Sequence, residues 1–326
     1  MSKVAKAEQE SNKPKQKYQV ENWSRYNQSL VNRGNITLYM SEDALKHWKA
    51  ACPKQRGGQY VYSDVCIETI FMLKTVFKLA YRQATGFTQS LLTIMGFKAL
   101  KVPSYTQVNR RVKELDIQPV PIKAKGPITI AIDSTGVKIF GEGEWKVRKH
   151  GYSKRRTWRK LHLGVDPQSG FIHCHTLTEN DIDDGSQLRP LLAQVKPKVQ
   201  EVYCDGAYDY YECWQALVDQ KINPVIPPRE GAVHWYAKTP GDRPDYPRNQ
   251  AIDRIHETDR QTWKKESNYH QRSLAETAMF RFKTIHAANL FSRKLETQQK
   301  EIDMKIKTIN IMTAQGMPMS KPKVTA

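Results

Sequence analysis

Cysteine is scarce in this chain of 326 residues, and the few present are not spaced for a disulfide or zinc site. The chain has five cysteines, an odd number, and no pair with C-x-x-C spacing. We therefore expect neither a disulfide framework nor a structural zinc centre, and instead expect buried free thiols in a reducing compartment.

Long apolar runs are also missing. The most apolar stretch, residues 65–81, is interrupted by Glu68, Lys74 and Lys78, so it does not have the composition of a membrane span. The first residues lack the apolar core of a signal peptide, and no basic amphipathic helix stands out. We expect a soluble intracellular protein with no membrane association.

Acidic residues are outnumbered by basic ones. The chain carries 52 Lys and Arg against 33 Asp and Glu, which gives a formal net charge of +19. Such an excess indicates a polyanionic partner. Because the membrane is disfavoured, nucleic acid is the expected partner.

One stretch, residues 269–283, combines helix-forming residues with an unusual set of polar side chains. It contains neither Gly nor Pro and is predicted to be helical. At about 100° per residue, Tyr269, Arg272, Glu276 and Lys283 share one stripe about 60° wide. A carboxylate flanked by two cations and a phenol suits a site that holds a metal ion and binds phosphates. The alternative is a solvated face on which Arg272 and Glu276 form an ordinary helix pair.

Two aspartates follow short apolar segments that are predicted to be strands. Asp133 ends the alternating segment 128–133, and the next three residues are expected to form a turn. Asp205 ends the segment 201–205, and Gly206 then lets the backbone turn close to a ligand.

The chain resembles bacterial insertion-sequence DDE transposases. The residues from Tyr269 to Lys283 match the Tyr-Arg-Glu-Lys signature of that family, and Asp133 and Asp205 match its two earlier acids. The resemblance covers residues 128 to 295 and, more loosely, the segment before them. It implies an α/β fold of ribonuclease-H-like type, with a mixed sheet flanked by helices. It also implies a DNA transposase acting in the bacterial cytoplasm at the nucleoid, as a homo-oligomer in the synaptic complex.

The resemblance assigns the chemistry to Asp133, Asp205 and Glu276, as catalytic residues and metal ligands. Three converging carboxylates repel one another unless cations intervene, and oxygen-only ligands suit Mg²⁺ or Mn²⁺. Two such ions activate the attacking oxygen and stabilise the leaving one, which serves both strand cleavage and strand transfer. By the same resemblance, Tyr269, Arg272 and Lys283 hold DNA phosphates.

A helical segment, residues 61–115, precedes the predicted catalytic domain. We expect a helix from Ser63 to about Ala84, a break at Gly86, a short second helix and a third from residue 105. This small all-α domain resembles a helix-turn-helix, although its turn is longer than usual. The third helix would contact DNA through a polar face: Gln107, Asn109, Arg110 and Arg111. The alternative is a helical bundle with a charged outer face.

Three further segments contain candidate DNA-binding or structural residues. The basic run 138–160 is expected to hold a nucleic-acid backbone, for example through Lys149, Arg155 and Arg156, rather than to be a solvated hairpin. The acidic cluster 179–185 is interpreted as helix-start acids, with an auxiliary structural role near the site as the alternative. Trp235, in a Pro- and Gly-rich insertion, either stacks on an unpaired base or anchors a long loop.

Strand histidines of the hairpin 161–176 are expected to be packed residues rather than zinc ligands. The predicted organisation is an arm (1–22), a helical DNA-binding region (23–118), a linker (119–127), a catalytic domain (128–295) with an insertion (227–262), and a C-terminal helix and tail (296–326). The alternative functions are a metal-dependent nuclease without strand transfer and an inactive DNA-binding regulator derived from a transposase.

Overall fold

The computed structural model describes residues 18–51, 59–120, 122, 126–139, 158–235 and 246–322. The chain forms two compact units. The larger unit consists of residues Ile36–Ile311. The smaller unit consists of two segments, Met1–Asn35 and Met312–Ala326. Of the helices in these described ranges, none is long and apolar enough to cross a membrane.

The smaller unit brings the two ends of the chain together. Strand β1 (Tyr18–Val20) pairs antiparallel with β8 (Ser320–Pro322), and α2 (Trp23–Asn32) follows β1. The side chain of Asn22 donates to the carbonyl of Met317 at 3.1 Å and accepts from the amide of Met319 at 2.8 Å. The sequence predicts irregular chain at 1–22 and from 315 onward. This is wrong for 18–20 and 320–322, because each strand pairs with a segment at the other end of the chain.

The helical module contains η1 (Ile36–Leu38), α3 (Glu42–Lys46), α4 (Asp64–Val76), α5 (Tyr81–Ile94) and α6 (Tyr105–Arg111). The hydroxyl of Ser63 accepts from the amide of Cys66 at 3.1 Å, which caps α4 as predicted. The predicted break at Gly86 is wrong. Helix α4 ends instead before Lys78, whose φ is 54°, and Gly86 lies inside α5. A left-handed residue ends a helix, whereas a single interior glycine only weakens one.

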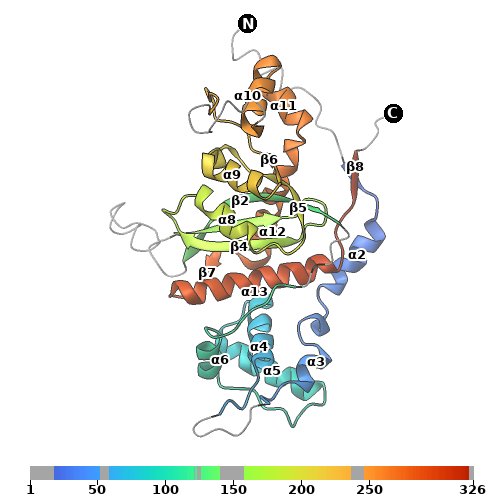
Figure 1. The fold of residues 1–326 in the computed structure, drawn as a ribbon. Coiled ribbons are helices and arrows are strands. Elements are labelled where there is room, and N and C mark those ends of the chain that lie inside the picture. Colours follow the sequence, from blue (N-terminus) through green and yellow to red (C-terminus); the bar gives the residue numbers. More distant parts are fainter. Residues whose placement is uncertain are drawn as a thin grey trace, which may run out of the picture. The chain divides into compact units, whose positions relative to one another are not determined.

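A six-stranded mixed sheet forms the centre of the larger unit (Figure 1). Its strands are β2 (Ile128–Ile139), β3 (Trp158–Val165), β4 (Ile172–Glu179), β5 (Val199–Tyr203), β6 (Asn223–Val225) and β7 (Asn289–Leu290). The order is β4-β3-β2-β5-β6, with β7 also pairing with β2. Strand β3 is antiparallel to β2 and β4, whereas β5 and β6 run parallel to β2. This confirms the ribonuclease-H-like fold.

Helices cover the sheet and divide its packing into two hydrophobic cores. One core joins β2 and β5 to α8 (Leu188–Leu192), η3 (Gly206–Tyr208) and α9 (Tyr211–Asp219). The 3-10 turn η2 (Gly185–Gln187) directly precedes α8. The other joins β3 and β4 to α12 (Ser273–His286) and α13 (Leu295–Ala314). Phe282 of α12 is fully buried there, so truncating it to Ala would cost about 3–5 kcal/mol. Packing therefore fixes the helix that carries Glu276.

The predicted insertion is partly helical rather than irregular. Helices α10 (Pro247–Glu257) and α11 (Arg260–Glu266) lie within or next to it, followed by a 3-10 turn, η5 (Tyr269–Arg272). Proline at the first position suits the start of α10. The carboxylate of Asp259 accepts from the amides of Gln261 and Thr262 and so caps α11.

Candidate active site

The two aspartates meet because of the register of β2 and β5. These strands are parallel, and Ala131 lies opposite Tyr203. Asp133 and Asp205 each follow two residues later, on chains that lie about 4.8 Å apart where they pair. The sequence predicts that Asp133 ends its strand, and this is wrong. Strand β2 continues to Ile139 because β3 pairs with it as far as Lys138.

Arg272 connects the first acid to Glu276. Its Nη1 lies 3.1 Å from Oδ2 of Asp133, and its Nη2 donates to Oε1 of Glu276. Asp205 uses its Oδ1 to accept from the amide of Ala207 at 2.9 Å. The structure therefore brings Asp133 and Glu276 to one guanidinium, and Asp205 follows the strand that pairs with that of Asp133. That the three acids form one metal site stays a prediction.

The signature residues do not all lie on one helical stripe. Tyr269 and Arg272 form the turn η5, which follows Asn268 with a φ of 52°, and the α-helix starts only at Ser273. Tyr269 packs against Trp263, with ring centroids 6.1 Å apart, and burial raises its pKa to about 12. Lys283 is exposed on α12, about 10 Å along the axis from Glu276.

Electrostatics at this cluster follow from burial and mutual repulsion. Burial raises the pKa of Asp133 above its ordinary value, the amide of Ser134 and the guanidinium of Arg272 oppose that rise, and Asp205 and Glu276 add to it. The side chain of Glu276 is 56% exposed, whereas that of Asp133 is 17% exposed. Glu276 therefore has freedom to move towards the two strand acids.

Donor chemistry and spacing decide whether the three acids can hold a metal ion. All three offer carboxylate oxygens, the ligands that Mg²⁺ and Mn²⁺ prefer. Within the part of the chain that the structure describes, no three His, Cys, Asp or Glu side chains are close enough to hold a metal ion as they stand. Arg272 pairs with both Asp133 and Glu276, so that guanidinium would have to move before these carboxylates could share a divalent ion.

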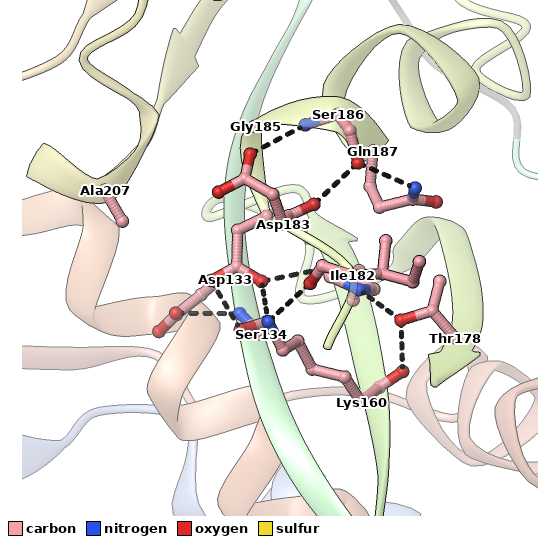
Figure 2. A network of polar contacts seen from close by, with 12 residues as sticks. Asp133, Ser134, Lys160, Thr178, Ile182, Asp183, Gly185, Ser186, Gln187 and Ala207 are labelled. Carbon is pink, nitrogen blue, oxygen red and sulfur yellow. Dashed lines mark hydrogen bonds and ion pairs between the residues drawn. The ribbon is translucent and has the colours of Figure 1, made fainter. Parts of the chain in front are cut away.

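A polar network that includes Ser134, Lys160 and Ile182 lies beside the strand that carries Asp133 (Figure 2). Asp184 accepts two of its contacts. The hydroxyl of Ser134 donates to Oδ2 of Asp184 at 3.1 Å, and Nζ of Lys160 lies 3.1 Å from its Oδ1. Lys160 also donates to the carbonyl of Ile182 at 2.7 Å. The sequence showed Asp184 only as one acid of a cluster at a helix start. Its contact with the residue after Asp133 depends on tertiary packing, for which the sequence has no signal.

Asp209 attaches the insertion to the core. Its carboxylate accepts from Nε and Nη2 of Arg248, at 2.7 and 3.1 Å. It also accepts from Nε1 of Trp214 and from the amide of Arg229, both at 2.9 Å. Sequence reasoning missed this role, because nothing distinguishes Asp209 from other acids near Asp205.

Trp235 contacts the same arginine. The guanidinium carbon of Arg248 lies 3.7 Å from the centroid of the Trp235 ring, and Tyr211 and Tyr246 lie at its edges with centroids 5.7 and 6.3 Å away. One face of the indole is therefore covered. This packing corresponds to the alternative interpretation of Trp235, as an anchor of the insertion.

Helix α6 presents three of its four predicted DNA contacts to solvent, namely Gln107, Asn109 and Arg110. The prediction that Arg111 contacts DNA is wrong, because this residue is 7% exposed and its contacts lie within the protein. Its guanidinium donates to the carbonyl of Tyr62, lies 2.5 Å from Asp64 and covers the ring of Tyr60. The basic residues Lys149, Arg155 and Arg156 lie outside the described residues.

Comparison with family models identifies the chain. Two models match, both described as a transposase DDE domain, one over residues 31–142 and the other over residues 124–311. The second covers more than half of the chain, so this protein belongs to the transposase DDE domain family. The prediction of a DDE transposase is confirmed, whereas its assignment to the bacterial insertion-sequence group stays a prediction.

Solved structures with a similar arrangement come from DNA transposition and retroviral integration. The chain is similar to the piggyBac transposase synaptic complex with hairpin DNA, at 10% identity over 87% of this chain and 76% of that chain, with a TM-score of 0.40. It is similar to the Drosophila P element transposase strand transfer complex, at 14% identity over 59% and 48%, with a TM-score of 0.30. It is also similar to the simian T-cell lymphotropic virus intasome in complex with PP2A regulatory subunit B56 gamma, at 14% identity over 68% and 74%, with a TM-score of 0.24.

Proposed function

We propose that this protein is the DNA transposase of an insertion sequence, which binds the terminal inverted repeats, cleaves the DNA there and joins the ends to target DNA. The observation that carries the proposal is the cluster in which Arg272 joins Asp133 to Glu276 beside Asp205. Three acids and an arginine gathered around the paired strands β2 and β5 match the needs of phosphoryl transfer, which depends mainly on positioning and charge.

The three acids would be held by different elements of the fold. Asp133 and Asp205 come from paired strands and are held by the sheet, whereas Glu276 comes from a helix packed on the other core. When bound, two Mg²⁺ or Mn²⁺ ions would supply activation of the attacking oxygen and stabilisation of the leaving oxygen. Asp133, Asp205 and Glu276 would hold them.

Arg272 would change partners when DNA arrives. In the described arrangement it neutralises two acids, and a guanidinium also forms paired hydrogen bonds with phosphate. We propose that Arg272, Tyr269 and Lys283 contact phosphates next to the scissile bond. Lys283 is exposed and available for such a contact, and Tyr269 lies on the same turn as Arg272.

End recognition is assigned to α6, with Gln107, Asn109 and Arg110 as the base and backbone contacts. The basic residues Lys149, Arg155 and Arg156 and the indole of Trp235 remain candidates for further DNA contacts. The protein would act in the bacterial cytoplasm at the nucleoid, and as a homo-oligomer when two element ends are brought together.

The test is Mg²⁺-dependent cleavage of a duplex that ends in the repeat flanking this protein's gene. We expect Asp133→Asn, Asp205→Asn and Glu276→Gln each to lower cleavage at least about a thousandfold, while binding of the repeat persists, because each removes a metal ligand. Asp181→Asn, an exposed acid of the 179–185 cluster, is the matched control. Cleavage at the parent rate by any of the three variants would exclude that residue as an essential ligand.

Strand transfer is tested separately by supplying repeat ends with a free 3′-hydroxyl. Joined products that require the same three acids are expected of a transposase. Cleavage without joined products would indicate the nuclease instead.

A further inference from the structure

A cavity of about 750 Å³ lies within the larger unit, away from the three acids. It is bounded by the helical module on one side and by the segment from the end of α12 to α13 on the other. The module and α13 are held together there, since Nζ of Lys307 lies 2.5 Å from a carboxylate oxygen of Glu68. The cavity is therefore a built feature of the packing between these two parts of the unit.

The lining of this cavity is strongly cationic. Six basic residues line it against a single acid, Glu301, and they are Lys74, Lys78, Lys113, Arg293, Lys294 and Lys305. Glu301 is already satisfied inside the protein. It pairs with Lys305 at 2.9 Å and accepts from the amides of Phe291 and Ser292 at 3.0 and 3.1 Å. Its charge is thus used by one lysine and by the loop, which leaves the other five cations in excess.

In the described ranges, no direct ion pair involves Lys74, Lys78, Lys113, Arg293 or Lys294. The ammonium of Lys74 lies over two rings, 4.9 Å from the centroid of Tyr81 and 5.7 Å from that of Phe71. Burial lowers the pKa of Lys74, Glu301 opposes this change and Lys305 adds to it. An anion in the cavity would compensate the charge of Lys74.

A buried histidine also lines the cavity. His286 lines the cavity and is 3% exposed, and its Nδ1 has no hydrogen-bond partner among the described residues. Its Nε2 lies 2.8 Å from the hydroxyl of Thr308. A buried ring nitrogen without a partner is uncommon in a folded protein unless a ligand or water satisfies it.

The arrangement of the cations favours an extended anion over a compact one. Lys78, Lys113, Arg293 and Lys294 are exposed and form a rim, whereas Lys74 and Lys305 lie deeper. Asn109 of α6 and Lys113, which follows that helix, belong to the lining, so the helix assigned to end recognition borders the cavity directly. A DNA strand contacted by α6 would bring its neighbouring phosphates to this rim.

We propose that this cavity is a phosphate-binding site for the backbone of the DNA that α6 contacts, formed jointly by the helical module and the α12–α13 region. It rests on the proposed function in that the bound DNA is the element end. It extends that function by adding Lys78, Lys113 and Lys294 to the DNA contacts and by using the C-terminal helix as one wall.

The experiment measures the salt dependence of binding to a repeat-end duplex by the full-length parent and by Lys78→Ala/Lys113→Ala/Lys294→Ala. Each lost phosphate contact is expected to reduce the slope of log K against log salt by about 0.9, so the triple variant loses up to about 2.7. The control is Lys46→Ala/Lys196→Ala/Lys198→Ala, which removes the same charge from exposed positions outside the cavity and should keep the parent slope. Thermal unfolding of both variants confirms that they fold.

An unchanged slope in the cavity variant would overturn the proposal. Binding of inorganic pyrophosphate by the parent and by the cavity variant then shows which of two results this is. If the variant has also lost pyrophosphate binding, the cavity is a site for small anions, and if it has not, the cavity binds no phosphate. Both results leave the proposed transposase function standing. That function fails instead if the parent protein does not prefer the repeat to a scrambled duplex or does not cleave it.

Discussion

Two arginine–aspartate pairs in the same fold serve opposite purposes. The pair of Arg248 and Asp209 is almost fully buried, with side chains 5% and 1% exposed, and Asp209 accepts four hydrogen bonds. The pair of Arg272 and Asp133 is 20% and 17% exposed, and among the described residues Asp133 accepts from Arg272 and from the amide of Ser134 alone. One carboxylate is saturated, and the other retains room for a further ligand.

This difference separates a structural ion pair from an exchangeable one. A buried charge whose partner is lost has nothing else to bind, so its pair is fixed once the protein folds. A half-open pair exchanges its arginine for a metal ion or a phosphate at small cost. Hydrogen-bond saturation and burial, rather than residue type, distinguish the anchor of the insertion from the site that we propose to be catalytic.

The largest effect on stability is expected at the buried pair. Asp209→Asn removes the negative charge that compensates Arg248 and should lower the free energy of unfolding by about 3–5 kcal/mol. Asp133→Asn is the matched substitution in the open pair and should change it by less than about 1 kcal/mol. Urea unfolding followed by tryptophan fluorescence measures both. Equal losses in the two variants would show that burial does not set the difference.

A smaller effect tests burial at a group next to the open site. His162 is fully buried, with Nε2 3.0 Å from the hydroxyl of Thr178, and burial lowers its pKa to about 4. The unfolded chain takes up a proton near pH 6.5 and the folded chain does not, so stability falls as the pH drops from about 6.5 towards about 4. The shifted pKa of His162 should therefore lower the free energy of unfolding by about 2 kcal/mol between pH 7 and pH 5.

The pH prediction is checked with His162→Asn, which has no proton to gain in this range. Its free energy of unfolding, compared with its own value at pH 7, should fall less than that of the parent at pH 5. The same loss in both proteins would mean that His162 does not titrate abnormally.

The smallest effect on stability is expected from Arg272→Ala. This pair is partly exposed, so the variant should lose no more than about 1 kcal/mol of stability. Its affinity for the repeat end should nevertheless fall, and the salt slope of that binding should shrink by about 0.9 for the lost phosphate contact. A parent-like slope would remove Arg272 from the DNA contacts and leave it as a counter-ion of the two acids.

Much of the fold was accessible from the sequence because it depends on local patterns. Alternation predicted the β3–β4 hairpin, and capping residues such as Ser63 predicted helix starts. The signature from Tyr269 to Lys283 predicted the family. The boundary errors have local physical causes: a lysine rather than a glycine took the left-handed conformation after α4, and a 3-10 turn replaced the start of the signature helix.

The parts that sequence could not predict depend on contacts between distant segments. The pairing of β1 with β8, the bond from Ser134 to Asp184 and the burial of Asp209 against Arg248 join residues that no periodicity relates. Arg111 illustrates the same limit, since its place on a basic helix predicted a DNA contact although its guanidinium is turned inward onto Asp64. A residue's position on a helix does not reveal which neighbouring element covers it.

The most direct test of the central claim is Mn²⁺ binding to the protein–repeat complex, measured by electron paramagnetic resonance. We expect the parent complex to bind Mn²⁺ and the Glu276→Gln variant to bind it at least about tenfold more weakly. The Asp181→Asn variant should bind Mn²⁺ like the parent. Equal Mn²⁺ affinity for the parent and Glu276→Gln would contradict the central claim, since Glu276 would then lie outside any shared metal site with Asp133 and Asp205.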